Sequence, residues 1–254
     1  MAGSPIGFPL EIHGQISDRL SSGRDLYAYL RTCRAIFGEV ERRLYRKIRL
    51  EHCELQKFDG FIQGLSNNPH LLRFVGELWL SFEYIQDEIV PQLTLALAGM
   101  VGLTYLHLDI NNLRFSQLLH QNYTFRLKRF EYAPSDPDIT HNYNEPLTSF
   151  LTSQSSIKHL DIAIHSSLIP LPHTALPNLR VLCGTALLAR SVMPGRAVER
   201  LYWTSPGSSS HRLSDHAYLA LKVLKLFTQP ISFALVKCLN LQYLEFRVSS
   251  YSVS

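Results

Sequence analysis

The sequence predicts an α/β protein in which a small N-terminal helical unit precedes a curved parallel sheet of repeated strands. Three observations predict this class. Apolar residues recur at helical spacing in residues 1–50, and a short strand-like pattern occurs eight times between residues 75 and 246. In addition, the 254 residues are 46% hydrophobic and 18% charged, a balance that can bury a sizeable core and excludes a wholly disordered chain.

Residues 1–50 are expected to form three short helices. Pro9 suits the first turn of the first helix, where its missing N–H is not needed. The apolar residues of that helix, four apart and therefore on one face, are Ile12, Ile16 and Leu20. Those of the second helix are Leu26, Leu30, Cys33 and Phe37. A third helix is expected from Val40 to Tyr45, after which Ile48 and Leu50 alternate with charged residues, as at the start of a strand.

Particular residues of this unit stand in a distinctive order, which runs Phe8-Pro9-Leu10-Glu11-Ile12, Ile16, Leu20, Arg24-Asp25-Leu26, Tyr29-Leu30, Cys33-Arg34, Phe37 and Leu44-Tyr45-Arg46. Over residues 7–50 this order resembles the F-box of fungal F-box proteins, with Phe8 where the family usually has leucine. The resemblance implies that residues 1–50 are an F-box helical module that binds a Skp1-type adaptor. The residues expected at that contact are Phe8, Pro9, Leu10, Ile12, Ile16 and Leu26. The alternative is an ordinary N-terminal helical cap on a larger domain.

The remaining residues, 51–254, repeat one pattern: an apolar residue, two variable residues, an apolar residue, one variable residue and a final apolar residue. Successive copies start 19 to 30 residues apart. The copies are Val75-Leu78-Leu80, Leu103-Leu106-Leu108, Leu127-Phe130-Tyr132, Ile157-Leu160-Ile162, Leu179-Leu182-Gly184, Val198-Leu201-Trp203, Leu221-Leu224-Leu226 and Leu241-Leu244-Phe246. The final alternation has the two-residue period of a strand, so each copy is expected to supply one strand.

Stretches that can form helices lie between several of these strands, at residues 58–65, 92–100, 115–119, 146–151 and 231–238. Strands and helices alternating at this period resemble leucine-rich repeats, in which stacked units form a solenoid with a curved parallel sheet. The solenoid is expected to be irregular, because the family's asparagine occurs only once, at Asn111, and because residues 133–145 and 204–215 resemble surface loops. Without a polar capping segment after Phe246, its C-terminal end is expected to be open or truncated. An ordinary α/β domain with regularly spaced leucines is the alternative.

The variable residues beside the apolar positions should share the opposite face of the sheet. They combine both charges with aromatic side chains, which suits a protein surface better than a phosphate backbone. The anchors expected to contact a protein substrate are Trp79, Tyr105, Arg129, Arg200, Tyr202 and Tyr243. In the alternative interpretation these side chains only solvate an exposed sheet.

The net charge of +4 arises within residues 1–50, which hold nine Lys or Arg and five acidic residues. This local excess is typical of a solvated helical face. The expected sheet has no stripe of basic residues along it that would bind nucleic acid. Four cysteines without a CxxC pair indicate reduced thiols and a cytoplasmic or nuclear protein. Neither a signal peptide nor a membrane span is expected, since polar residues interrupt the longest apolar stretch, at 89–103.

The sequence indicates no catalytic residues, no metal site and no cofactor. The histidines closest together in the chain, His211 and His216, lie in a serine-rich segment without the three or four ligands of a zinc site. His159 and Asp161 should share a strand face, but the sequence places no nucleophile with them. Phosphate-binding, nucleophile-elbow and zinc-protease motifs do not occur. The protein is therefore expected not to be an enzyme.

Together these features favour a substrate-recognition subunit of a Skp1–cullin–F-box ubiquitin ligase. It would bind Skp1 through residues 7–50, reach the cullin through Skp1, and bind a protein substrate through the repeats, with no nucleic-acid or membrane partner. The alternative is a non-catalytic scaffold that binds Skp1 or other partners without a ligase role. A nucleic-acid-binding or enzymatic α/β domain is disfavoured, because the sequence shows neither the basic stripe of the first nor the convergent polar cluster of the second. The sequence leaves open the substrate, its need for phosphorylation or a small-molecule cofactor, and the oligomeric state.

Overall fold

The computed structural model describes residues 10–20, 22–31, 37–51, 53–82, 87–110, 115–133, 144–163, 171–203, 221–226 and 242–246. Within these residues, one sheet contains nine strands, each paired in parallel with its neighbours in the chain. The strands are β1 (Lys47–Glu51), β2 (Glu77–Phe82), β3 (Tyr105–Ile110), β4 (Arg129–Tyr132), β5 (His159–Ile162), β6 (Val181–Gly184), β7 (Arg200–Trp203), β8 (Val223–Leu226) and β9 (Tyr243–Phe246). The expected α/β class with a parallel sheet is confirmed.

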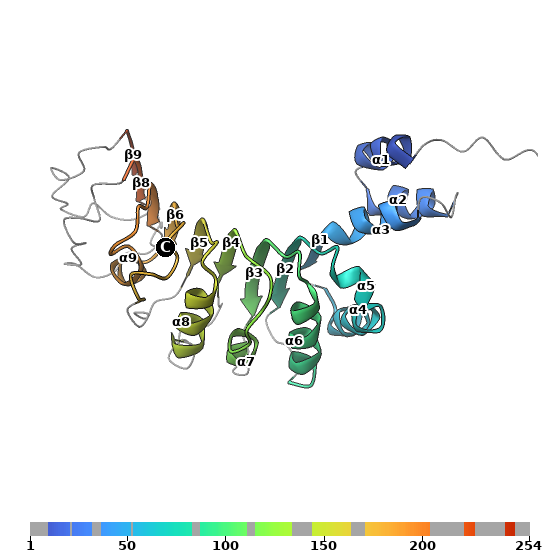
Figure 1. The fold of residues 1–254 in the computed structure, drawn as a ribbon, viewed down its shortest axis with the longest axis horizontal. Coiled ribbons are helices and arrows are strands. Elements are labelled where there is room, and N and C mark those ends of the chain that lie inside the picture. The colour runs from blue at the N-terminus through green and yellow to red at the C-terminus, as the bar shows by residue number, and fades with distance from the viewer. Residues whose placement is uncertain are drawn as a thin grey trace, which may run out of the picture.

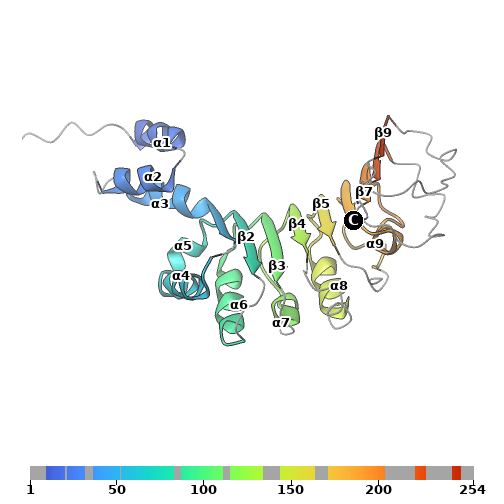
Figure 2. The same cartoon turned by 180° about the vertical axis from the view of Figure 1, so that it is seen from behind.

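Helices cover one side of this sheet. Those in the described residues are α1 (Leu10–Arg19), α2 (Gly23–Leu30), α3 (Phe37–Arg46), α4 (Leu55–Asn67), α5 (Pro69–Leu72), α6 (Ile89–Gly99), α7 (Phe115–Leu119), α8 (Asn144–Ser153) and α9 (Ala186–Val192). The sheet bends into an arc, with α4, α6, α7 and α8 along its outer side and α1 and α2 beyond the β1 end (Figure 1). The view from behind shows the same arrangement (Figure 2). None of these described helices has the length and apolar character needed to cross a membrane.

The repeated pattern sets the register of the sheet. Residues at the middle apolar position pair directly across β2 to β9: Leu78, Leu106, Phe130, Leu160, Leu182, Leu201, Leu224 and Leu244. The first six of these side chains are buried in the core between sheet and helices. All eight expected strands are therefore confirmed. Strand β1 is a ninth, and its Ile48 and Leu50 pair with Leu78 and Leu80 in the same register.

The three N-terminal helices have a small core of their own. Leu26 of α2 and Val40 of α3 are buried together, with Leu20, Tyr29 and Leu44 packed around them. Arg43 of α3 also pairs with Asp18 of α1, which ties the first helix to the third. Because α3 ends at Arg46 and β1 begins at Lys47, this helical unit continues directly into the sheet.

Helix α7 begins where it was expected, whereas α4, α6 and α8 begin two or three residues earlier. Helix α6, expected from residue 92, begins at Ile89, because Pro91 lies in its first turn, where no N–H is required. Helix α8 begins at Asn144, so the last two residues of the loop expected at 133–145 are helical. Helix α9 was not expected; Thr185 caps it by accepting a hydrogen bond from Leu188 N at 3.3 Å. The helix expected at 231–238, the loop at 204–215 and Asn111 lie outside the described residues.

Gly184 occupies a position in β6 where the repeat otherwise has a large apolar residue. Its φ is +149°, a backbone conformation that side-chain-bearing residues rarely adopt. A Cβ added at Gly184 would lie 2.6 Å from the carbonyl oxygen of Ile162 and 2.5 Å from Leu188 Cδ2. Glycine is needed here because β5 and α9 approach the backbone of β6 so closely.

Candidate functional site

Two rows of residues alternate with the core positions along the strands, and on β1 to β7 their side chains lie on the inner side of the arc, opposite the helices. The first row is Lys47, Glu77, Tyr105, Arg129, His159, Val181, Arg200, Val223 and Tyr243, and the second is Arg49, Trp79, His107, Glu131, Asp161, Cys183, Tyr202, Lys225 and Glu245. In β3 these residues are half-buried, while the alternate residues are fully buried. All six predicted anchors stand in these rows, which we call the inner face.

Glu131 is the centre of a hydrogen-bonded network on β2, β3 and β4. Tyr105 donates its hydroxyl proton to Glu131 Oε2 at 2.7 Å, and His107 Nδ1 lies 2.8 Å from the same oxygen. Arg129 donates from Nε to Glu131 Oε1 at 2.6 Å, and its guanidinium also lies 4.8 Å from the Tyr105 ring centroid. The network therefore holds Tyr105 and Arg129 in fixed positions on the inner face.

Electrostatics keep the Glu131 carboxylate ionised. Burial alone would raise its pKa, but hydrogen bonds from His107 and Tyr105 and the charge of Arg129 outweigh burial and lower the pKa to about 2. Burial and the hydrogen bond to Glu131 raise the pKa of Tyr105, so its hydroxyl remains a donor. The carboxylate thus accepts hydrogen bonds from neighbouring side chains rather than acting as an acid.

Trp79 was predicted as an exposed anchor, but the structure places most of its ring under other side chains. Only 8% of the residue is exposed. The Arg49 guanidinium lies 4.4 Å above the ring, and Tyr105 packs edge-on at 4.5 Å between centroids. The indole N–H donates to the Tyr105 hydroxyl at 3.1 Å. Trp79 therefore supports Tyr105 and Arg49, which form the accessible part of this region.

The other predicted anchors do not join this group. Arg200 is exposed and Tyr202 half-buried on β7, three strands from β4 and thus about 14 Å away at about 4.8 Å per strand. Tyr243, 48% exposed on β9, donates its hydroxyl proton to Glu245 at 3.1 Å. The predicted anchors therefore fall into two groups on the inner face, one at Trp79, Tyr105 and Arg129 and one toward its C-terminal end.

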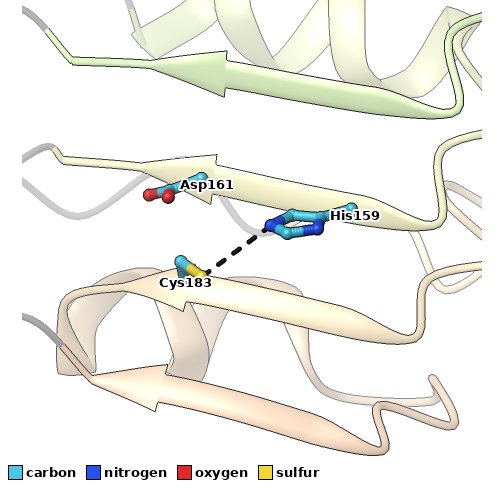
Figure 3. Close-up of side chains that lie close together, drawn as sticks. All are labelled: His159, Asp161 and Cys183. Atoms are coloured by element: carbon cyan, nitrogen blue, oxygen red, sulfur yellow. Dashed lines mark hydrogen bonds between the residues drawn. The ribbon is translucent and has the colours of Figure 1, made fainter. Parts of the chain in front are cut away.

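Between the two groups the structure brings together His159, Asp161 and Cys183 (Figure 3). The sequence placed no nucleophile beside His159 and Asp161, yet the register sets Cys183 opposite Asp161, with its Sγ 3.9 Å from His159 Nε2. Burial, and then the charge of Asp161, raise the pKa of the Cys183 thiol. Burial and the charge of Arg129 lower the pKa of His159. A protonated thiol beside a neutral imidazole is not the ion pair that a cysteine nucleophile uses.

The residues predicted to contact Skp1 differ in their accessibility. Phe8 and Pro9 lie outside the described residues, and Leu10 begins α1. Ile12 is 37% exposed, and Ile16 is half-buried. Leu26 is only 6% exposed, because it fills the small core of the helical unit. Ile12 is thus the most accessible of the predicted residues whose side chains are described.

A basic groove of about 970 Å³ lies where α3 meets the starts of β2, β3 and β4. The ionisable side chains that line it are Arg42, Arg46, Arg73, Lys128, Glu39 and Glu77. Part of the positive charge expected on a solvated helical face thus lines this groove. The sequence did not indicate the groove, because Arg73 and Lys128 come from the neutral remainder of the chain.

Comparisons with known proteins identify no family for the chain. No protein-family model matches the chain, and no curated protein matches it. What the protein does must therefore be inferred from its own residues and their geometry.

Proposed function

We propose that the protein is the substrate-recognition subunit of a Skp1–cullin–F-box ubiquitin ligase. Helices α1 to α3, as an F-box, bind a Skp1-type adaptor and through it the cullin, while the sheet, as an irregular leucine-rich-repeat solenoid, binds a protein substrate on its inner face. One observation carries the proposal: a three-helix unit with a separate core leads directly into a parallel sheet whose inner face is polar and aromatic. The protein performs no covalent chemistry and acts by raising the local concentration of its target.

Helices α1 to α3 favour a docking role because they bury little on their own. Among the residues that the structure describes, their core has only two buried apolar side chains, Leu26 and Val40. Ile12 stays partly exposed on α1, and Tyr27 is exposed on α2. Apolar side chains left at the surface of so small a unit are suited to burial by a partner.

Leucine-rich repeats are favoured by the order and register of the strands. Each strand pairs with the next in the chain, and each repeat contacts its neighbours, as in a solenoid. Spacings of 19 to 30 residues agree closely with the period of this repeat class. The inner face joins aromatic and arginine side chains to acidic ones, a composition that favours a protein partner over a nucleic acid.

Replacing both Pro9 and Ile12 with alanine is expected to weaken binding of Skp1 by about 10- to 100-fold, since truncating an apolar side chain at a hot spot costs about 1 kcal/mol or more. The affinity is measured by calorimetry with purified Skp1. The sheet should remain folded, because Ile12 lies on α1 and is not among the described residues that form the sheet core. Leu95→Ala is the matched control, since Leu95 is equally apolar and lies exposed on α6. Equal affinities for the double variant and the control would refute the proposed F-box surface.

Arg200→Glu combined with Tyr202→Ala is expected to abolish capture of the substrate while Skp1 binding remains. Both residues lie on the inner face, where the charge reversal and the loss of an aromatic ring remove two anchors. Proteins cross-linked to the intact Skp1 complex are compared between wild type and variant by mass spectrometry. Arg190→Glu, on the exposed side of α9, serves as the charge-matched control.

Two outcomes of that comparison count against the proposal. If the variant and wild type capture the same proteins, the substrate does not bind this part of the inner face. If the protein binds Skp1 but no captured protein is ubiquitylated when cullin, RING and conjugating enzymes are supplied, it is a scaffold without a ligase role.

A further inference from the structure

We propose that His159, Asp161 and Cys183 form a binding site for one divalent transition-metal ion, and that Zn²⁺ is the ion these ligands suit best. The site lies on the inner face of β5 and β6, between the two anchor groups (Figure 3). The proposal does not depend on Skp1 binding or on a ligase role.

The sheet itself brings the three ligands together. Asp161 pairs directly with Cys183 across β5 and β6, and His159 stands two residues before Asp161, on the same face. One ligand atom from each residue lies within 4.8 Å of the others, and Cys183 Sγ lies 3.9 Å from His159 Nε2. Because the strands are hydrogen-bonded in this register, the backbone positions of the ligands are fixed before any ion binds.

One of these separations is close to the edge of a zinc tetrahedron, and the others, at no more than 4.8 Å, must shorten when an ion binds. Bonds of about 2.0–2.3 Å to nitrogen, oxygen and sulfur place neighbouring ligand atoms about 3.3–3.6 Å apart. The Sγ–Nε2 separation is only slightly longer than that. All three side chains have rotatable bonds, and His159 and Asp161 are only half-buried, so rotations of these side chains can close the remaining gap without moving the strands.

The ligand chemistry selects the class of ion. A thiolate and an imidazole favour zinc and other late transition metals over Mg²⁺ or Ca²⁺, which prefer oxygen ligands alone. On binding, the ion displaces the proton of the Cys183 thiol into solvent, and the resulting thiolate and the Asp161 carboxylate together neutralise its two positive charges. Arg129, the nearest cationic residue in the first row, is already paired with Glu131 and so does not require Asp161 as its partner. Three protein ligands leave a fourth position for water or for a group on a bound molecule.

Cobalt(II) is the probe, because it replaces zinc in tetrahedral sites and absorbs visible light. We expect the reduced, metal-free full chain to bind one Co²⁺ with a thiolate-to-cobalt charge-transfer band and the d–d bands of a tetrahedral ion, and Zn²⁺ to displace it. Cys183→Ser should lose the charge-transfer band, and Asp161→Asn and His159→Gln should each weaken binding at least tenfold, since even outer-sphere partners contribute about 10- to 100-fold.

Cys53→Ser is the matched control, because Cys53 is the other cysteine in the described part of the chain and lies near β1, away from the site. It should keep both the spectrum and the affinity. Circular dichroism confirms that each variant is folded, and His159→Gln decides the question if Cys183→Ser does not fold. The proposal is overturned if wild type gives no saturable cobalt spectrum, or if the charge-transfer band persists in Cys183→Ser.

Discussion

Replacing Gly184 with alanine is expected to lower the free energy of unfolding by about 3 kcal/mol, from backbone strain and overpacking together. The new Cβ would meet the Ile162 carbonyl oxygen at 2.6 Å. That oxygen belongs to β5, which is held to β6 by the ladder of hydrogen bonds, so it cannot withdraw without disturbing the sheet. The positive φ of Gly184 adds strain for any residue with a side chain. Urea unfolding, followed by circular dichroism, measures the change.

Gly64→Ala is the control for this experiment. Gly64 lies within α4, and a Cβ added there meets nothing within 4 Å. Alanine is the better helix former by about 0.5–1 kcal/mol, so this variant should be slightly more stable than wild type. Unchanged stability of Gly184→Ala would show that β5, β6 and α9 do not approach one another as closely as described.

The strands could be predicted from the sequence because a single physical requirement repeats along the chain. Each strand must turn its apolar residues toward the helices, and a shift of one residue would expose all of them. The eight copies therefore predicted the strands, and aligning the copies with one another reproduces the register of β2 to β9. Strand β1 was expected only as a strand start. Its leading apolar position, before Ile48 and Leu50, is taken by Tyr45, and Tyr45 belongs to α3 rather than to a loop before the strand.

Features that depend on contacts between distant segments could not be predicted in this way. The need for glycine at position 184 arises from Leu188 and Ile162, which approach it from other elements. Arg196 is buried and donates to the carbonyl oxygens of Ala175 at 2.7 Å and Pro172 at 2.6 Å, although arginine ordinarily signals a surface position.

The sequence predicted which residues lie on the inner face but not which of them contact one another. Its residues follow from alternation along each strand, but alternation does not show that Arg49 and Tyr105 cover Trp79. The cluster of His159, Asp161 and Cys183 was not predicted, because no short segment of the chain holds all three ligands. Aligning the fourth and fifth copies of the repeat already sets Asp161 beside Cys183, so the signal was present across strands rather than along the chain.

Replacing Glu131 with glutamine is expected to lower the stability at pH 7 by about 3 kcal/mol and to flatten its dependence on pH in acid. The folded pKa of about 2 lies below the ordinary value of 4.5, so the unfolded chain takes up a proton at a higher pH than the folded protein does. This stabilisation is complete above pH 4.5 and is lost as the pH falls toward 2. Glutamine has no such proton to bind.

Unfolding free energies from urea titrations at a series of pH values between about 7 and 2 measure this contribution. Glu54→Gln is the control, since Glu54, the residue before α4, forms an exposed pair with Lys57, and such pairs contribute about 0–1 kcal/mol. Its profile should follow wild type. If Glu131→Gln loses as much stability in acid as wild type does, Glu131 is not the ionised centre of the network. Tyr105 and Arg129 would then be held on the inner face by packing alone, and their use as substrate anchors would not depend on the charge between them.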